Sequence, residues 1–269
     1  MTGTQLFPDI RLLFGMVNAH AADCETEMSL CISGSCEYCV NGEYFYLTAG
    51  SCIIRGGART VRDIAYSPDY RGITLLTDTR CVGSDDVFGI REQLAGIGEN
   101  EMRVFRAGDD IRRLAEEIYA VRSSSRASML RIKAVELLML LGERRYGHCE
   151  RAETIRLVGE FICQNVSEHY TIPRLAEQFA IAPHTLKAEF SRYFGSSVYS
   201  YTKLRKMFRA AELICTADMK IIDIAEEVGY CNASKFASAF RDVVGRAPRD
   251  YRTEHKLTAS SAKCAVKAS

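Results

Sequence analysis

Two short stretches in the C-terminal third of the chain combine a buried face with an exposed polar stripe. In residues 183–194, apolar side chains recur at helical spacing: Leu186, Phe190 and Phe194. The opposite face of that helix then carries His184, Lys187, Ala188 and Ser191. Further on, Phe236 and Phe240 mark a second buried face, and the outward positions are Ala233, Ser234, Ala237 and Ser238. Side chains of this size on an exposed helix can contact base edges in the major groove of duplex DNA, and we expect these eight to do so.

Positive side chains beside these stripes are suited to phosphate contacts. We expect such contacts from Arg192, Lys235 and Arg241, and further candidates are Arg205, Lys206, Arg209 and Arg249. The second stripe consists mostly of Ala and Ser, which can touch a thymine methyl group but cannot make the paired contact of arginine with guanine. Base reading is therefore expected mainly from His184 and Lys187. The alternative for either residue is a solvated side chain without a role.

Each stripe lies on the second helix of a predicted helix-turn-helix unit. In the first unit, Thr171 can cap a helix that has Pro173 in its first turn. Residues 180–182 then form a short break, and Pro183 starts the next helix. Two helices joined by so short a turn are typical of a unit that places its second helix in the major groove.

The plan recurs about fifty residues later. Apolar positions mark the first helix of this second unit: Ile221, Ile224, Ala225 and Val228. Residues 229–231 form its turn, and Asn232 is the N-cap of the second helix. A long amphipathic helix from about Val198 to Cys215 is expected to join the two units.

The segment from about Thr154 to Arg252 resembles the DNA-binding domain of the AraC/XylS family. The family pattern I-x-x-I-A-x-x-x-G-[FY], then two Phe, then G-x-x-P-x-x-[YF]-R is met by Ile221, Ile224, Ala225, Gly229, Tyr230, Phe236, Phe240, Gly245, Pro248, Tyr251 and Arg252. The first unit matches at Leu175, Ala176, Leu186, Phe190, Gly195 and Tyr201. The resemblance implies a transcription regulator whose partners are promoter DNA and RNA polymerase, and whose front half controls it through a small effector or through dimerisation.

The chain departs from the family pattern at three positions. Around the first turn the family has Gly and then Ser or Thr, whereas this chain has Ala180 and Ala182. If Ala180 takes a positive φ, we expect a strain of roughly 1 kcal/mol, and Ala182 cannot supply an N-cap hydroxyl. In the second helix of each unit, which we call the reading helix, exposed side chains are expected to face the DNA. In the reading helix of the second unit, this chain has Ser238 at a position where the family often has Arg.

The sequence predicts β-strands in the N-terminal half of the chain, between residues 28 and 77. Short runs rich in Ile, Val, Tyr, Phe and Thr cover Met28–Ser33, Cys36–Val40, Glu43–Leu47, Ser51–Ile54 and Gly72–Thr77. Asn41-Gly42 suits a type I′ turn, so a hairpin is expected there. The pattern implies a small barrel or sandwich, and Ser33-Gly34, Asn41-Gly42, Tyr46, Leu47 and Gly50 resemble the cupin-like effector-binding barrel common in the family.

Two helices are expected after the strands. The first begins near Asp109, with Ile111, Leu114, Ile118 and Val121 on one face. The second runs from about Ala127 to Arg144, with Ala134, Leu137, Leu138 and Leu141 on one face. Leu137 to Leu141 are apolar in succession, so more than one face of this helix can seek a partner. Covering the strands and pairing with a second copy of the chain both remain open.

The sequence therefore predicts an α+β chain in four parts. Residues 1–108 form a small cupin-like β-barrel, residues 109–150 the linker and dimerisation helices, residues 151–253 an all-α AraC-type domain with two helix-turn-helix units, and residues 254–269 a disordered tail. Residues 1–150 hold 17 basic and 21 acidic side chains, a net charge of −4, and the remainder holds 18 against 13, a net charge of +5. This asymmetry indicates that the back half meets a polyanion.

The eleven cysteines allow a rival function. Cys36 and Cys39, with Cys24, Cys31 and Cys52 near them, suggest a metal or thiol redox sensor. However, residues three apart on a regular strand point to opposite faces, which argues against chelation. An odd number of scattered cysteines is also not a secreted disulfide framework, and it favours a reducing cytoplasm.

Enzyme classes are excluded by missing motifs. No histidine lies between His20 and His148, so the barrel lacks the usual ligands of a cupin metal site. The sequence has neither a glycine-rich phosphate loop nor a G-x-S-x-G elbow. We expect no catalytic residues, no metal and no cofactor. The apolar run from Leu12 to Ala22 lacks a basic region ahead of it and is not expected to be a signal peptide, and no run approaches the ~20 residues of a membrane span.

Overall fold

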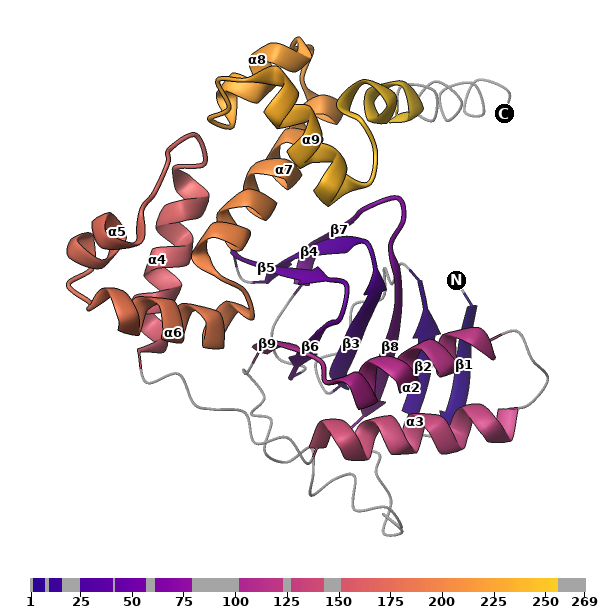
Figure 1. The fold of residues 1–269 in the computed structure, drawn as a ribbon. Coiled ribbons are helices and arrows are strands. Elements are labelled where there is room, and N and C mark those ends of the chain that lie inside the picture. The colour runs from indigo at the N-terminus through magenta and orange to yellow at the C-terminus, as the bar shows by residue number, and fades with distance from the viewer. Residues whose placement is uncertain are drawn as a thin grey trace.

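The chain folds into a sheet-rich N-terminal half and a helical C-terminal half (Figure 1). The computed structural model describes residues 2–7, 10–15, 25–40, 42–56, 61–78, 102–122, 127–142 and 151–255. The strands are β1 (Thr2–Phe7), β2 (Ile10–Phe14), β3 (Glu25–Ser33), β4 (Ser35–Val40), β5 (Glu43–Thr48), β6 (Ser51–Arg55), β7 (Val61–Tyr66), β8 (Arg71–Asp78) and β9 (Met102–Arg106). The helices are α2 (Asp109–Ala120), α3 (Ala127–Gly142), α4 (Ala152–Gln164), α5 (Ile172–Gln178), α6 (Pro183–Phe194), α7 (Val198–Thr216), α8 (Ile221–Glu227) and α9 (Ala233–Val244). The mixed fold class is as predicted.

The strands form two antiparallel sheets. The larger has the order β1-β2-β8-β3-β6-β9, and the smaller has the order β5-β4-β7. Within the described residues both sheets are open, so the strands form two sheets rather than one closed barrel, and the cupin-like character of the predicted barrel is not confirmed. Edge strand β5 of the smaller sheet packs against β3, β6 and β9 of the larger sheet and also against helices α4 and α7 of the C-terminal half. The predicted hairpin is confirmed, since β4 pairs with β5 from Ser35↔Thr48 to Val40↔Glu43; Asn41 lies outside the described residues.

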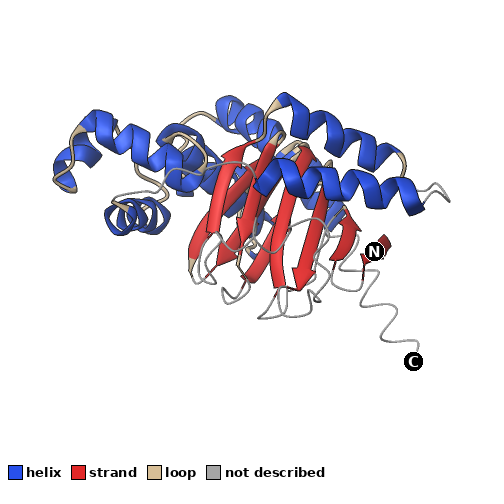
Figure 2. Cartoon of the chain, turned by 90° about the horizontal axis from the view of Figure 1, so that it is seen from below, coloured by secondary structure: helices blue, strands red, loops and turns tan. Residues whose placement is uncertain are grey.

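The two faces of the larger sheet differ in character. Met28 and Leu30 of β3 point to an apolar face that also holds Ile54 of β6 and Leu75 of β8. Helices α2 and α3 cover this face (Figure 2). Both buried stripes of these helices are as predicted, except that Val121 is only partly buried. Covering the sheet is therefore one established role of the two helices.

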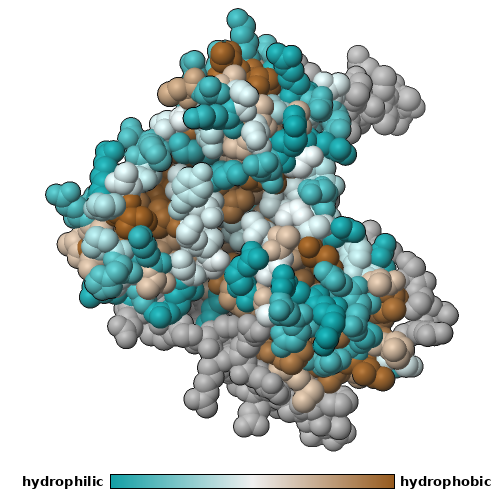
Figure 3. All heavy atoms as spheres, in the orientation of Figure 1, coloured by the Kyte–Doolittle hydropathy of each residue, from teal (hydrophilic) through white to brown (hydrophobic). Residues whose placement is uncertain are grey.

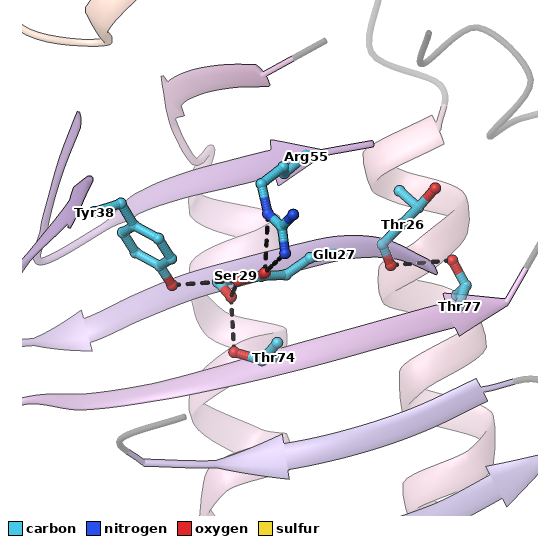
Figure 4. Close-up of polar contacts among 7 residues, drawn as sticks. All are labelled: Thr26, Glu27, Ser29, Tyr38, Arg55, Thr74 and Thr77. Carbon is cyan, nitrogen blue, oxygen red and sulfur yellow. Dashed lines mark hydrogen bonds and ion pairs between the residues drawn. The ribbon is translucent and has the colours of Figure 1, made fainter. Parts of the chain in front are cut away.

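The opposite face of the larger sheet is polar although it is buried. Glu27 of β3 makes an ion pair with Arg55 of β6, with 2.7 Å between Oε2 and Nη2 (Figure 4). Ser29 donates a hydrogen bond to Glu27 and contacts the Thr74 hydroxyl at 2.7 Å. Glu27 and Arg55 are each about 2% exposed, so both charges are almost fully desolvated and depend on one another.

The C-terminal half consists of two helix pairs joined by a buried helix. Helices α5 and α6 form the first pair, α8 and α9 the second, and α7 contacts members of both. As predicted, Thr171 accepts a hydrogen bond from the Arg174 N–H, and Asn232 accepts one from the Lys235 N–H. A further helical segment covers residues 248–255, so the helix continues past the start of the predicted tail, of which residues 256–269 lie outside the described part. No helix in the described ranges is long and apolar enough to cross a membrane.

The turns of the two units place different residues in the left-handed region of backbone space. Ala180 has φ 50° in the first turn, as predicted for a residue where the family has glycine. Gly229 has φ 77° in the second, and a Cβ there would lie 1.9 Å from the Ser167 carbonyl oxygen. Ala182 caps α6 without a side-chain hydrogen bond. The first turn therefore carries backbone strain that the second avoids.

Exchanging the residue types at the two turns should change stability in opposite directions. Ala180→Gly should raise the free energy of unfolding by up to about 1 kcal/mol, because it relieves the left-handed strain. Gly229→Ala should lower it by more than about 2 kcal/mol, because strain and a contact with the Ser167 carbonyl act together. Urea unfolding of the full chain measures both. Gly42→Ala is the matched control, since Gly42 has φ 84° with nothing within 4 Å of a Cβ; equal losses at Gly42 and Gly229 would show that Ser167 moves aside.

Candidate nucleic-acid interface

The predicted reading face of α6 is exposed. Helix α6 begins at Pro183 and turns Leu186, Phe190 and Phe194 into the core, where each is at most 2% exposed. The opposite face carries His184, Lys187, Ala188 and Ser191, which are all exposed to solvent. The structure therefore brings these four side chains together on one open surface. Their contact with DNA remains a proposal.

Helix α9 presents its outward face in the same way. Phe236 and Phe240 are fully buried, and they form an aromatic series with Tyr230 and Tyr251. Ala233, Ser234 and Ser238 are exposed, whereas Ala237 is partly buried. This face offers two hydroxyl groups and small methyl groups, but no long side chain along the predicted stripe.

The candidates for phosphate contacts divide into exposed and buried residues. Arg192, Lys235 and Arg241 are exposed, and Arg192 forms an ion pair with Glu189 one turn earlier in α6. Arg205 and Lys206 are each only 7% exposed, so the expectation that they contact phosphate is wrong. Both are buried on α7 among the apolar residues of the predicted amphipathic helix. The sequence pattern placed them on the surface because they are charged.

Lys206 instead contacts residues near both helix-turn-helix units. Its Nζ donates to the Ser167 carbonyl at 3.4 Å and lies 5.8 Å from the centre of the Tyr230 ring. Ser167 precedes the first unit, and Tyr230 belongs to the turn of the second. Burial lowers the pKa of Lys206, with Glu168 acting in the opposite direction. Lys206 of α7 thus contacts both the segment that precedes α5 and the turn between α8 and α9.

Helix α7 also joins the C-terminal half to the smaller sheet. Tyr201, 1% exposed, donates to the Tyr44 carbonyl at 3.0 Å, and its ring packs edge-on against Tyr46. Arg205 donates to Glu37 of β4 at 3.2 Å. The sequence predicted Tyr201 as a family position and gave no sign of its partners, because they lie about 160 residues away in the chain.

The cysteines that the structure describes do not form the centre of a rival site, and Cys24 lies outside the described residues. Burial raises the pKa of Cys31 to about 12, with Asp69 adding to the shift, and burial raises the pKa of Cys163 to about 11. Such thiols are protonated at neutral pH, which makes them poor nucleophiles and poor metal ligands. Cys36 is fully buried while Cys39 is partly exposed, as expected for opposite faces of β4. Among the described residues no group of three metal-ligating side chains gathers, and redox sensing has no support.

Comparison with known proteins assigns the helical half to a family. The model of a helix-turn-helix domain matches residues 175–254, which include the second unit and the first unit from within α5 onward. An XylDLEGF operon transcriptional activator of Pseudomonas putida is 28% identical over 132 residues, covering 47% of this chain and 84% of that protein. The thermoregulatory protein LcrF of Yersinia pestis is 24% identical over 226 residues, covering 78% of this chain and 80% of LcrF.

Solved structures include similar helical domains. The C-terminal domain of AraT, a response regulator from Geobacillus stearothermophilus, is 27% identical, with a TM-score of 0.37 over 41% of this chain and 88% of that domain. The relatives named here are regulators and activators rather than enzymes. With two helix-turn-helix units on the family's motif positions and transcriptional activators among its relatives, the helical half of the chain is an AraC-type DNA-binding domain, similar to that of the AraC/XylS family of transcription regulators.

Proposed function

We propose that the protein reads a specific promoter sequence with α6 and α9, placed in successive major grooves on one face of the duplex. The observation that carries this proposal is the pair of exposed stripes on the second helices of two units joined by one buried helix. Helices entering successive grooves lie about 34 Å apart along the DNA axis. RNA polymerase is the partner such a regulator acts on, and its place of action is the cytoplasm.

Selection from random duplex DNA tests sequence reading directly. Purified, reduced full-length protein should enrich a motif with two conserved blocks about one helical turn apart, one for each reading helix. Sequencing of the bound pool gives the motif and the spacing. Strongly salt-dependent binding without any enriched sequence would show contact with phosphates alone and would contradict the proposal.

Lys187 should contribute to base reading. Lys187→Ala should weaken binding to the selected site by about 1 to 3 kcal/mol and relax one base position, because its exposed side chain leaves α6 toward the proposed groove. Binding titrations on the site and on single-base variants measure this. Arg113→Ala on α2, which removes a charge from an exposed side chain far from the stripes in sequence, is the control. An equal loss on every sequence would assign Lys187 to phosphate.

The N-terminal half is proposed to control DNA binding in one of two ways. Its buried polar face around Glu27, Arg55 and Thr74 offers hydrogen-bonding groups for a small polar effector, in an interior reminiscent of the family's effector-binding domain. The second way is dimerisation through α3, whose outward face carries Met129, Ile132 and Met139 at 42%, 65% and 38% exposed. Figure 3 shows apolar surface over the part of the molecule where α3 lies.

A second copy of the chain is the occupant we propose for the α3 face. A two-fold axis would place the same apolar residues of both copies against one another. Ile132→Glu should then convert a dimer to a monomer at micromolar concentration, as measured by sedimentation equilibrium. Ile222→Glu is a matched control, because Ile222 is 53% exposed on α8. A wild-type protein that sediments as a monomer, or an Ile132→Glu variant that stays dimeric, would contradict this role for α3.

A further inference from the structure

Strand β4 faces two different parts of the molecule with its alternate residues. Side chains on a strand point to opposite faces in turn. Ser35 and Glu37 contact the helical half, whereas Cys36 and Tyr38 point into the space between the two sheets. Ser35, Cys36, Glu37 and Tyr38 are all buried, so both faces of β4 are packed.

The outer face of β4 holds two helices of the DNA-binding domain. The Ser35 hydroxyl donates to the carbonyl of Val243 in the last turn of α9 at 2.7 Å. Glu37 accepts from Arg205 of α7 at 3.2 Å, and the Arg205 guanidinium lies 3.9 Å from the centre of the Tyr44 ring. β4 therefore contacts both the helix that joins the two units and the second reading helix.

The contact between β4 and α7 is an ion pair between two buried side chains, Glu37 and Arg205. Burial raises the pKa of Glu37, and the Arg205 charge beside it and the Tyr46 hydroxyl act in the opposite direction, so these two neighbours stabilise the carboxylate. A buried charge that loses its partner is strongly unfavourable. Separating Glu37 from Arg205 would leave both charges buried without this partner, so the pair favours β4 and α7 staying in register.

The inner face of β4 joins the buried polar network of the larger sheet. Tyr38, 1% exposed, donates from its hydroxyl to Glu27 Oε1 at 3.4 Å (Figure 4). Glu27 is held by Arg55 and Ser29, and Ser29 contacts Thr74. Glu27 and Arg55 are thus connected to β4 through Tyr38, which is next in sequence to Glu37.

We propose that β4 transmits the state of the N-terminal interior to the reading helices, with Tyr38 as its inner contact and with Glu37 and Ser35 as positioning residues for α7 and α9. This inference rests on the proposed function and adds the route by which the N-terminal half controls DNA binding. It requires energetic coupling between residues on the two faces of β4. A merely structural role of each residue would give independent effects.

Hydrogen–deuterium exchange on the full chain tests the coupling without DNA. Tyr38→Phe keeps the ring and removes only the hydroxyl, so the fold is retained, as circular dichroism can verify. Amides of residues 203–209 in α7 and 241–245 in α9 should exchange about fivefold faster, as expected for the loss of one buried hydrogen bond. Glu37→Gln should have the same effect, and the double variant should show no further increase.

Thr77→Val is the matched control for Tyr38→Phe. Thr77 is 1% exposed, and its hydroxyl donates to the Thr26 carbonyl at 3.3 Å within the larger sheet, where Thr77 pairs with Thr26 of β3 and Ile10 of β2. This variant should leave exchange in α7 and α9 unchanged. Wild-type exchange in those helices for Tyr38→Phe, or additive effects of Tyr38→Phe and Glu37→Gln, would overturn the proposal.

DNA binding by the same variants separates this inference from the proposed function. Tyr38→Phe and Glu37→Gln should each weaken binding to the selected site several-fold, because loosened helices must be ordered on binding. Unchanged affinity in both variants would overturn the role of β4 as a transmitter. If the wild-type protein selects no sequence at all, the proposed function fails, and the exchange result still decides whether β4 couples the two halves.

Discussion

The aromatic contact between helix α7 and the smaller sheet is the constraint on which the rest of the structure depends. Tyr201 lies at its centre: its ring packs against Phe190, Phe194 and Tyr46, and its hydroxyl is satisfied by the Tyr44 carbonyl. Large aromatic side chains remove more apolar area from water than other residues, so this cluster contributes strongly to the association of the two halves. β5 thus contacts the larger sheet and the helical half at the same time. One core then runs from β4 and β5 through α4, α6 and α7 to α9.

Unlike that apolar core, the interior of the larger sheet holds a buried ion pair, Glu27 and Arg55. A buried pair such as Glu27 and Arg55 adds little net stability, since the desolvation of both charges offsets their attraction, yet loss of one partner costs about 3 to 5 kcal/mol. Apolar residues of similar volume would stabilise the sheet at least as well. Such a pair is therefore better suited to specifying the position of neighbouring groups than to stability. Tyr38 is one of those neighbours, and through it the network is connected to β4.

Sequence patterns predicted the local elements well and the long-range contacts poorly. The two helix-turn-helix units could be predicted because their signals are local: caps at Thr171 and Asn232, and buried Phe at helical spacing. Strands β1, β2, β7 and β9 were not predicted; Ile10–Phe14, for example, can equally be part of a longer apolar run. A barrel was predicted because the order of strands in a sheet depends on long-range pairing, which no local sequence pattern shows. Arg205 and Lys206 were predicted as surface cations, because the partners that make their burial tolerable, Glu37 and Ser167, are far away in sequence. The eight predicted base contacts remain predictions.

The two helix-turn-helix units differ in how their second helices are supported and in which side chains those helices expose. The second has a glycine in its turn, a side-chain N-cap at Asn232 and a carbonyl held by Ser35, but its face offers only small side chains. The first has a strained Ala180 and lacks a capping hydroxyl at Ala182, which together amount to about 2 kcal/mol, but it carries His184 and Lys187. Short side chains discriminate bases only when the helix is placed accurately, whereas long ones tolerate displacement. The better supported helix is thus the one that needs accurate placement, and the contact from β4 reaches that helix.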